Sequence, residues 1–393
     1  MSTSLLIIAG ALLGVIFLLL FRVQALIAVL RGSDKKPGTS NKVNAFMFLV
    51  FFVCFSGGYI YYSLEGDYGL PQAASVHGLE TDSFLLLSMV IISVAMLITN
   101  FLLMFFAYKY QYNPKTKATF FPEHHTLELI WTVIPAIVLT YLVVQGEGSW
   151  TAIMNPTKEM VADKVEIEIV GSQFKWEVRY PGLDGKLGSH KFLSLSADNT
   201  FGINLSDKRG YDDFQVTKMV LPVNRPVHFK IRAKDVLHSV FALHFRVKMD
   251  AVPGMPTEFW FTPNKTTAEM RSQLASKPRF QTLNEDGETK ASVFNYEICC
   301  AEICGKGHNS MRFVIEIVDQ ETYDIWYDKQ AHAAPFVLLN EDYIKANLPS
   351  DMVSVFNEKL SQFKVVDEIL EPVSDTLVFE EVISEVHIEV APH

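Results

Sequence analysis

The feature that most constrains this fold is the concentration of apolar sequence before residue 150 of the 393-residue chain. Four segments there approach the ~20 residues that a helix needs to cross the hydrocarbon core of a membrane. They are Leu5–Leu30, Ala45–Tyr62, Ser83–Ala107 and Leu127–Val144. We therefore predict four transmembrane helices. A signal peptide is the alternative for the first segment, but no positive residue precedes Leu5 and no small-residue cleavage site follows it.

The positive residues of the short loops predict how these helices are oriented. Lys and Arg lie between the first and second segments (Arg31, Lys35, Lys36, Lys42) and between the third and fourth (Lys109, Lys115, Lys117). The loop between the second and third segments is acidic instead. Because short loops rich in Lys and Arg stay in the cytoplasm, the N-terminus and everything after residue 146 should lie on the exported side.

The sequence from Lys164 to Val318 has the short alternating or β-branched runs typical of strands. We predict strands at Val165–Val170, Phe174–Tyr180, Lys218–Val223, Val227–Arg232, Phe259–Thr262, Ser292–Glu297 and Arg312–Val318. These strands favour an antiparallel sandwich or barrel. The Gly-, Asp- and Ser-rich stretch from Pro181 to Asp213 should be a long surface excursion.

Four regions follow from this pattern. Residues 1–62 form an N-terminal extension with two helices, and residues 83–146 form a two-helix transmembrane hairpin. Residues 147–330 form the β domain, with a helix from about Asp319 to Gln330, and residues 331–393 form an acidic C-terminal extension. The expected fold class is thus a membrane-anchored α+β chain, in which transmembrane helices precede an all-β domain.

Charge and cysteine content exclude two classes of protein. Lys plus Arg is 34 and Asp plus Glu is 44, which gives a formal net charge of −10. An acidic chain is a poor ligand for nucleic acid, whereas a basic redox partner suits it. Only four cysteines are present, and three of them lie between residues 299 and 304, so they cannot form the disulfide framework of a small secreted domain.

Two of the clustered cysteines belong to a motif with the side chains of a metal site, Cys-x-Glu-x-Cys-x-x-x-His-x-x-Met. It places Cys300, Cys304, His308 and Met311 within twelve positions. Thiolate, imidazole and thioether are soft ligands that together suit copper, and a structural zinc loop would rarely include Met. Two thiolates four residues apart can bridge a pair of metal ions. We expect His238, more than sixty residues upstream, to supply one more nitrogen.

Three stretches together resemble a known family. Asp-Val-Leu-His-Ser at 235–239, the run 247–254 and the Cys-His-Met motif occur in the order found in subunit II of cytochrome c oxidase, which carries the dinuclear copper centre CuA. The resemblance covers about residues 83–330. It implies a cupredoxin-like Greek-key sandwich for the β domain.

The resemblance also implies a role for individual residues. Cys300 and Cys304 would bridge two coppers, while His238 and His308 would each bind one. Met311 and the Glu302 carbonyl would be weak axial ligands. The Glu302 side chain would reach a magnesium or manganese ion shared with subunit I. Cys299 should face the other side of the strand, and His244 should be a packed or surface histidine.

Glu128, at the start of the fourth apolar segment, has two interpretations. It is either a helix-start carboxylate favoured by the helix dipole or, as the resemblance implies, the carboxylate through which protons reach the neighbouring subunit. The chain departs from the family pattern at Phe174, where a Trp usually follows Gln, so that Trp176 is the nearest aromatic for electron input. It also departs at Met255, where an Arg usually follows Pro-Gly.

The expected function is that of the electron-accepting subunit of a proton-pumping oxidase in the bacterial inner membrane, with its copper domain in the periplasm. Expected partners are subunits I and III, a c-type cytochrome and, through the N-terminal helices, a quinol:cytochrome c reductase. The alternative is a non-oxidase CuA electron-transfer protein. A quinol oxidase subunit would lack the ligands, a nitrous oxide reductase would need a further domain, and a copper-storage protein would not need Glu302 or the paired helices.

Overall fold

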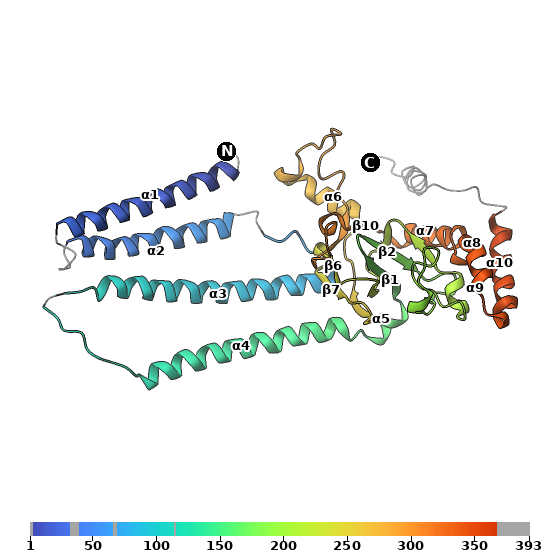
Figure 1. The fold of residues 1–393 in the computed structure, drawn as a ribbon, viewed down its shortest axis with the longest axis horizontal. Coiled ribbons are helices and arrows are strands. Elements are labelled where there is room, and N and C mark those ends of the chain that lie inside the picture. The colour runs from blue at the N-terminus through green and yellow to red at the C-terminus, as the bar shows by residue number, and fades with distance from the viewer. Residues whose placement is uncertain (1–2, 32–38, 66–68, 114, 368–393) are drawn as a thin grey trace, which may run out of the picture. The chain divides into compact units, whose positions relative to one another are not determined.

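The computed structural model describes residues 3–31, 39–65, 69–113 and 115–367. The chain divides into two compact units. One comprises residues 1–70 and 86–138, and the other comprises residues 71–85 and 139–393. Figure 1 labels the helices and several of the strands, and the two units are described separately below.

Four long helices dominate the N-terminal half: α1 (Thr3–Leu30), α2 (Thr39–Glu65), α3 (Val76–Lys109) and α4 (His125–Met154). Within the described residues, three helical stretches are long and apolar enough to cross a membrane, namely Asn41–Leu64, Val76–Lys109 and His125–Ala162. They confirm three of the four predicted spans. The apolar stretch described in α1, Leu12–Ile27, is shorter, so the first span stays a prediction.

Helices α2 and α3 contact each other within their unit. The Tyr59 hydroxyl lies 2.5 Å from Ser93 Oγ, and the rings of Phe52 and Phe101 lie 5.8 Å apart between centroids. A hydrogen bond between side chains in an apolar stretch satisfies two polar groups that lipid could not satisfy. This contact fixes the register of the two helices.

Ten strands form the β domain. They are β1 (Val165–Ser172), β2 (Lys175–Tyr180), β3 (Phe214–Val216), β4 (Met219–Pro222), β5 (Val227–Ala233), β6 (His238–Ala242), β7 (Val247–Ala251), β8 (Thr257–Phe261), β9 (Tyr296–Cys300) and β10 (Arg312–Val318). Two five-stranded sheets result, in the orders β3-β2-β1-β5-β8 and β4-β10-β9-β6-β7. Apolar residues of both sheets fill one core, so the domain is a sandwich and not a barrel.

The sheets are mixed, so the prediction of an antiparallel arrangement was wrong for two pairs of strands. β1 pairs in parallel with β5, and β4 in parallel with β10. Each pair joins strands whose connection passes through the other sheet, and such a crossover returns the chain in the same direction. The strand predicted at Ser292–Glu297 lies further on, at β9, because residues 292–295 are used by the turn that precedes it. β3, β6 and β7 were not predicted.

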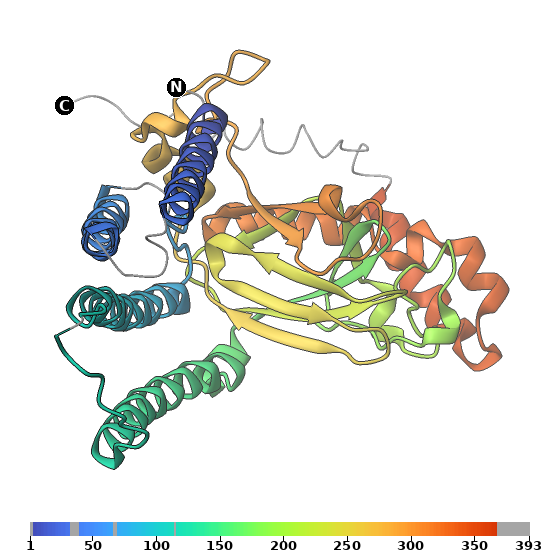
Figure 2. The same ribbon diagram turned by 60° about the vertical axis from the view of Figure 1, so that its left-hand side comes forward.

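Helix α5 (Lys158–Ala162) precedes the first strand, and α6 (Thr267–Ala275) lies between β8 and β9. The chain ends in α7 (Gln320–Ala333), α8 (Phe336–Leu339), α9 (Glu341–Asn347) and α10 (Val353–Asp367). Helix α7 confirms the helix predicted after Asp319. Helices α8, α9 and α10, drawn in red-orange, lie together at one end of the sandwich, next to the light-green excursion, in both ribbon views (Figures 1 and 2).

This contact gives the C-terminal extension a structural role that its acidic sequence did not suggest. Val337, Ile344, Phe356, Leu360 and Phe363 bury their side chains against one another and against two residues of the excursion, Leu205 and Tyr211. The excursion is accordingly packed and not merely superficial, since Asn199 and Tyr211 are fully buried. Residues 368–393 lie outside the described residues.

Candidate metal centre

His238 is the first residue of β6 and is fully buried. Its Nε2 lies 2.9 Å from Asp235 Oδ1, and its Nδ1 lies 3.8 Å from Cys300 Sγ. When Nε2–H donates to the carboxylate, the lone pair of Nδ1 points toward the sulfur atoms. A carboxylate behind a ligand histidine is the usual device that fixes its tautomer and the orientation of its ring.

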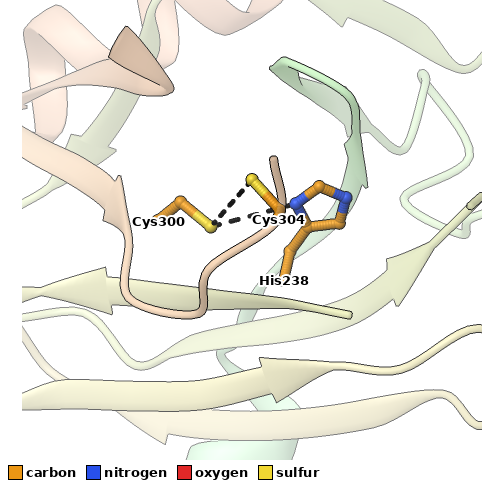
Figure 3. Close-up of side chains that lie close together, drawn as sticks. All are labelled: His238, Cys300 and Cys304. Carbon is orange, nitrogen blue, oxygen red and sulfur yellow. Dashed lines mark hydrogen bonds between the residues drawn. The ribbon is translucent and has the colours of Figure 1, made fainter. Parts of the chain in front are cut away.

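Cys300 ends β9, and Cys304 lies four residues on, in the loop that leads to β10. Their sulfur atoms are 3.9 Å apart. Figure 3 shows both sulfur atoms and the near ring nitrogen of His238 directed toward one another. Ligand atoms of these three buried residues all lie within 4.8 Å of each other, which makes them the one group of this kind among the described residues.

Three further donors surround the two sulfur atoms. His308 Nδ1 lies 3.7 Å and Met311 Sδ lies 3.9 Å from Cys304 Sγ, while the Glu302 carbonyl oxygen lies 3.2 Å from Cys300 Sγ. Six donor atoms therefore converge on one space. Burial, and then the neighbouring Cys300, raise the pKa of Cys304 to about 11, so this thiol keeps its proton until a metal displaces it.

The donor set fits a pair of copper ions. Two sulfur atoms within reach of a shared metal, one imidazole beside each and a thioether make a soft set that copper prefers, and Cys304 and Met311 are almost entirely buried. Zinc sites seldom include Met and need only four ligands in a tetrahedron.

Gln173 and Asp235 join the loops that hold these ligands, and the sequence analysis assigned them no role. The Gln173 backbone N–H donates to Asp235 Oδ2 at 2.7 Å, and its side-chain amide donates to the Cys304 carbonyl at 2.6 Å. Asp235 belongs to the stretch 235–239 quoted above, three residues before His238, and that position was a signal for a supporting role. Gln173 directly precedes Phe174.

Trp176, the aromatic expected for electron input, and Phe174, which stands where the resemblance leads us to expect Trp, both lie beside the candidate ligands. Trp176 is buried, and its ring meets His238 edge-on at 5.8 Å between centroids. Phe174 is 38% exposed and lies against the ligand loop, where a Cβ at Gly307 would meet its ring at 2.5 Å. Of these two rings, that of Phe174 is partly exposed and that of Trp176 is buried.

The other residues singled out by the sequence lie away from the converging donors. Cys299 Sγ faces Glu297 Oε2 at 4.0 Å, and burial raises its pKa. The His244 ring packs on Phe294 and Tyr296, and its pKa falls to about 4, first through burial and then through Arg246. The Glu302 side chain is exposed.

Glu128 lies in the first turn of α4, in the other compact unit of the chain. Its carboxylate accepts the His124 backbone N–H at 3.2 Å and lies 3.6 Å from His125 Nδ1. This geometry is that of a helix-start carboxylate, which satisfies a backbone donor left free at the helix end. The same carboxylate is 44% exposed, so it also remains accessible to a neighbouring chain.

Comparison with known proteins gives two matching family models. The transmembrane domain of cytochrome c oxidase subunit II matches residues 63–145, and the periplasmic domain of the same subunit matches residues 165–270. The second match ends before the Cys-His-Met motif. The motif therefore supplies information that the family match does not contain.

This chain matches most of the length of two curated relatives that are named as subunit 2 of cytochrome c oxidase. The alternative cytochrome c oxidase subunit 2 of Bradyrhizobium diazoefficiens is 29% identical over 61% of this chain and 78% of its own. Cytochrome c oxidase subunit 2 of Cereibacter sphaeroides is 26% identical over 66% of this chain and 77% of its own. Among solved structures, the periplasmic domain of subunit II of cytochrome oxidase from Bradyrhizobium japonicum is 23% identical over 42% of this chain and 92% of that one, with a TM-score of 0.27.

Proposed function

The chain belongs to the cytochrome c oxidase subunit II family, as a bacterial-type member with additional N-terminal helices, and we propose that it accepts electrons for a haem-copper terminal oxidase. It is a membrane-anchored protein with a periplasmic domain. In this proposal a c-type cytochrome is the donor, haem in subunit I is the acceptor, and oxygen reduction in that subunit is coupled to proton pumping.

The observation that carries the proposal is the convergence of donors from His238, Cys300, Glu302, Cys304, His308 and Met311 on one buried space. Cys300 and Cys304 would bridge two coppers, and each histidine would bind one. A pair of coppers bridged by thiolates supplies a one-electron carrier whose charge is shared between two metals.

The protein's own residues hold these ligands in place. Asp235 fixes the His238 ring, and Gln173 holds the carbonyl of Cys304. Because β6 and β9 are hydrogen-bonded neighbours in one sheet, the two ends of the ligand set are fixed by backbone pairing. A rigid, dry ligand set changes little in geometry when its charge changes by one, which lowers the barrier to electron transfer.

Several residues carry further parts of the proposal. The carboxylate of Glu302 would bind a magnesium or manganese ion shared with subunit I. Glu128 would deliver protons on the cytoplasmic side, and Trp176, whose ring meets His238 edge-on, would be the aromatic nearest the route of electron input. Subunit III and a quinol:cytochrome c reductase would be further partners in the bacterial inner membrane.

Substituting single ligands tests the assignment. Cys300→Ser, Cys304→Ser and His308→Ala should each abolish the dinuclear copper signal in the assembled oxidase, because each removes a bridging or terminal ligand. Cys299→Ser is the matched control, since its thiol faces Glu297. Copper quantification with electron paramagnetic resonance gives the answer. Loss of the signal in Cys299→Ser would show that the ligand register is wrong.

A further inference from the structure

The outer face of the β3-β2-β1-β5-β8 sheet carries a row of alternating charges. The strand register places Glu168 opposite Arg179 on one side and Lys230 on the other, and Lys230 opposite Glu258. These side chains point away from the apolar core, because Ile167 and Ile169 of the same strand face it. A row of this kind normally faces water, yet Glu168 and Arg179 are almost completely buried.

The excursion covers this row. Residues Leu187–His190 and Arg209 lie over the sheet, and the Gly188 backbone bonds to two buried side chains, with its N–H donating to Asp213 and its carbonyl accepting from Arg179. The C-terminal helices hold the excursion down through Leu205 and Tyr211. The excursion and the C-terminal helices together therefore cover the charged face of the sheet.

The excursion does not pack directly against the whole of this face of the sheet. A cavity of about 630 Å³ remains between them, with a charged floor and apolar wall residues such as Met154, Leu187 and Met249. Its volume lies within the range of small-molecule sites.

Arg232 and His190 have hydrogen-bond donors without a partner in the described part of the chain, whereas Glu168, the buried carboxylate of the cavity, is already paired through both oxygens. Arg232 bonds to Glu168 through Nε and to the Phe201 carbonyl through Nη2, but its Nη1 has no partner among the described residues. The His190 ring likewise makes no hydrogen bond within the described part of the chain. Glu168 already accepts from two arginines, and Glu258 lies 2.9 Å from His228 Nε2.

This imbalance indicates the charge of the ligand. Burial, and then the Arg232 guanidinium, lower the pKa of His190, which shows that another positive charge is unfavourable here. Lys230 has a half-exposed ammonium, and among the described residues its one ion-pair partner is Glu166, at 3.1 Å. A metal cation would need several carboxylate oxygens, and the buried Glu168 is already paired with two arginines.

We propose that this cavity binds a phosphate group through Arg232, Lys230 and His190. The planar guanidinium presents donors that match two phosphate oxygens, and lysine adds a point charge. The phosphate can belong to a soluble molecule or to a lipid headgroup. The second source is relevant because Met154, in the cavity wall, ends α4, a helix long enough to cross a membrane.

Calorimetric titration of the purified, lipid-stripped oxidase with inorganic phosphate, at constant ionic strength, tests the proposal. Saturable binding should weaken about tenfold or more in Lys230→Gln and in His190→Ala, since each loses a charged or hydrogen-bonding partner of the anion. Lys290→Gln is the matched control because it removes the same charge from an exposed loop outside the cavity. An unchanged copper signal confirms that each variant is folded.

A second arm separates the two sources. Phosphatidylglycerol vesicles replace inorganic phosphate, with the same three variants. Binding of vesicles alone, weakened by Lys230→Gln and not by Lys290→Gln, would support the site and identify a lipid headgroup as the ligand. Absence of saturable binding in both arms, or equal affinities in Lys230→Gln and Lys290→Gln, would overturn the proposal.

Discussion

Gly171 of β1 has no side chain, and the ring of the candidate ligand His238 lies where a side chain would begin. Adding one methyl group there should therefore weaken copper binding. A Cβ at this position would lie 2.9 Å from Trp176 Cζ3 and 3.0 Å from His238 Cδ2. Carbon atoms normally approach to about 3.5–4.0 Å, so both rings must move by roughly 0.5–1 Å. The Trp176 ring is buried on its other side, and His238 is held by Asp235.

The expected size of the effect follows from that overlap. Adding a methyl group to a packed core costs about 1–3 kcal/mol. If the strain is relieved by displacing the His238 ring, it appears as weaker metal binding, and about 1.4 kcal/mol corresponds to tenfold in affinity. Gly171→Ala should therefore lower copper affinity roughly 5- to 100-fold.

Competition with a copper chelator measures this affinity, with metal content and the paramagnetic signal followed on the assembled oxidase. Gly148→Ala is a suitable control, because no atom lies within 4 Å of a Cβ at that helical position. If Gly171→Ala and Gly148→Ala lose copper at the same chelator concentration, and unfold at the same temperature, the assigned packing around His238 is incorrect.

Three more predictions concern protons and charge. Glu128→Gln should slow oxygen reduction with copper intact; normal turnover and proton uptake would leave only the helix-start role. Burial raises the pKa of Asp213 to about 7 despite Arg179, so the folded state keeps a proton that the unfolded state loses near pH 4. The contribution of Asp213 to the free energy of unfolding therefore falls as the pH rises from 4 to 7. The melting temperature of Asp213→Asn should lack that fall. If the melting temperatures of the variant and the unmodified protein depend on pH in the same way, this reasoning is wrong. Donor association should weaken with salt, as stopped-flow rates would show, whereas a salt-independent rate would indicate a permanently docked donor.

The parts of the fold that were predictable are those encoded in local patterns. β1 and β10 alternate between core and outer face, and the sequence therefore predicted their positions. The proposed metal ligands other than His238 lie between Cys300, the last residue of β9, and Met311, so their spacing in the sequence already places them close together. The apolar length of α3 and α4 was similarly sufficient.

The remaining features depend on contacts between distant residues. The sequence of helix α10 has only moderate amphipathic character. In the folded domain Tyr211, which is far away in the sequence, provides an edge-on partner for Phe356. β6 is short and begins with a metal ligand, so its alternation is masked. The link from Gln173 to Cys304 joins residues 131 positions apart and requires the folded sandwich. No local pattern contains that information.

The placement of the ligands at the same end of neighbouring strands has a practical consequence. His238 begins β6, Cys300 ends β9, and Met311 directly precedes β10, while β9 pairs with both of the other strands. Because 62 residues separate His238 from Cys300, their donors meet only after these non-local pairings have formed. Under the proposed function, copper binding would therefore be a spectroscopic report on the closure of this sheet. The appearance of the dinuclear signal during refolding would time the assembly of three strands in a single measurement.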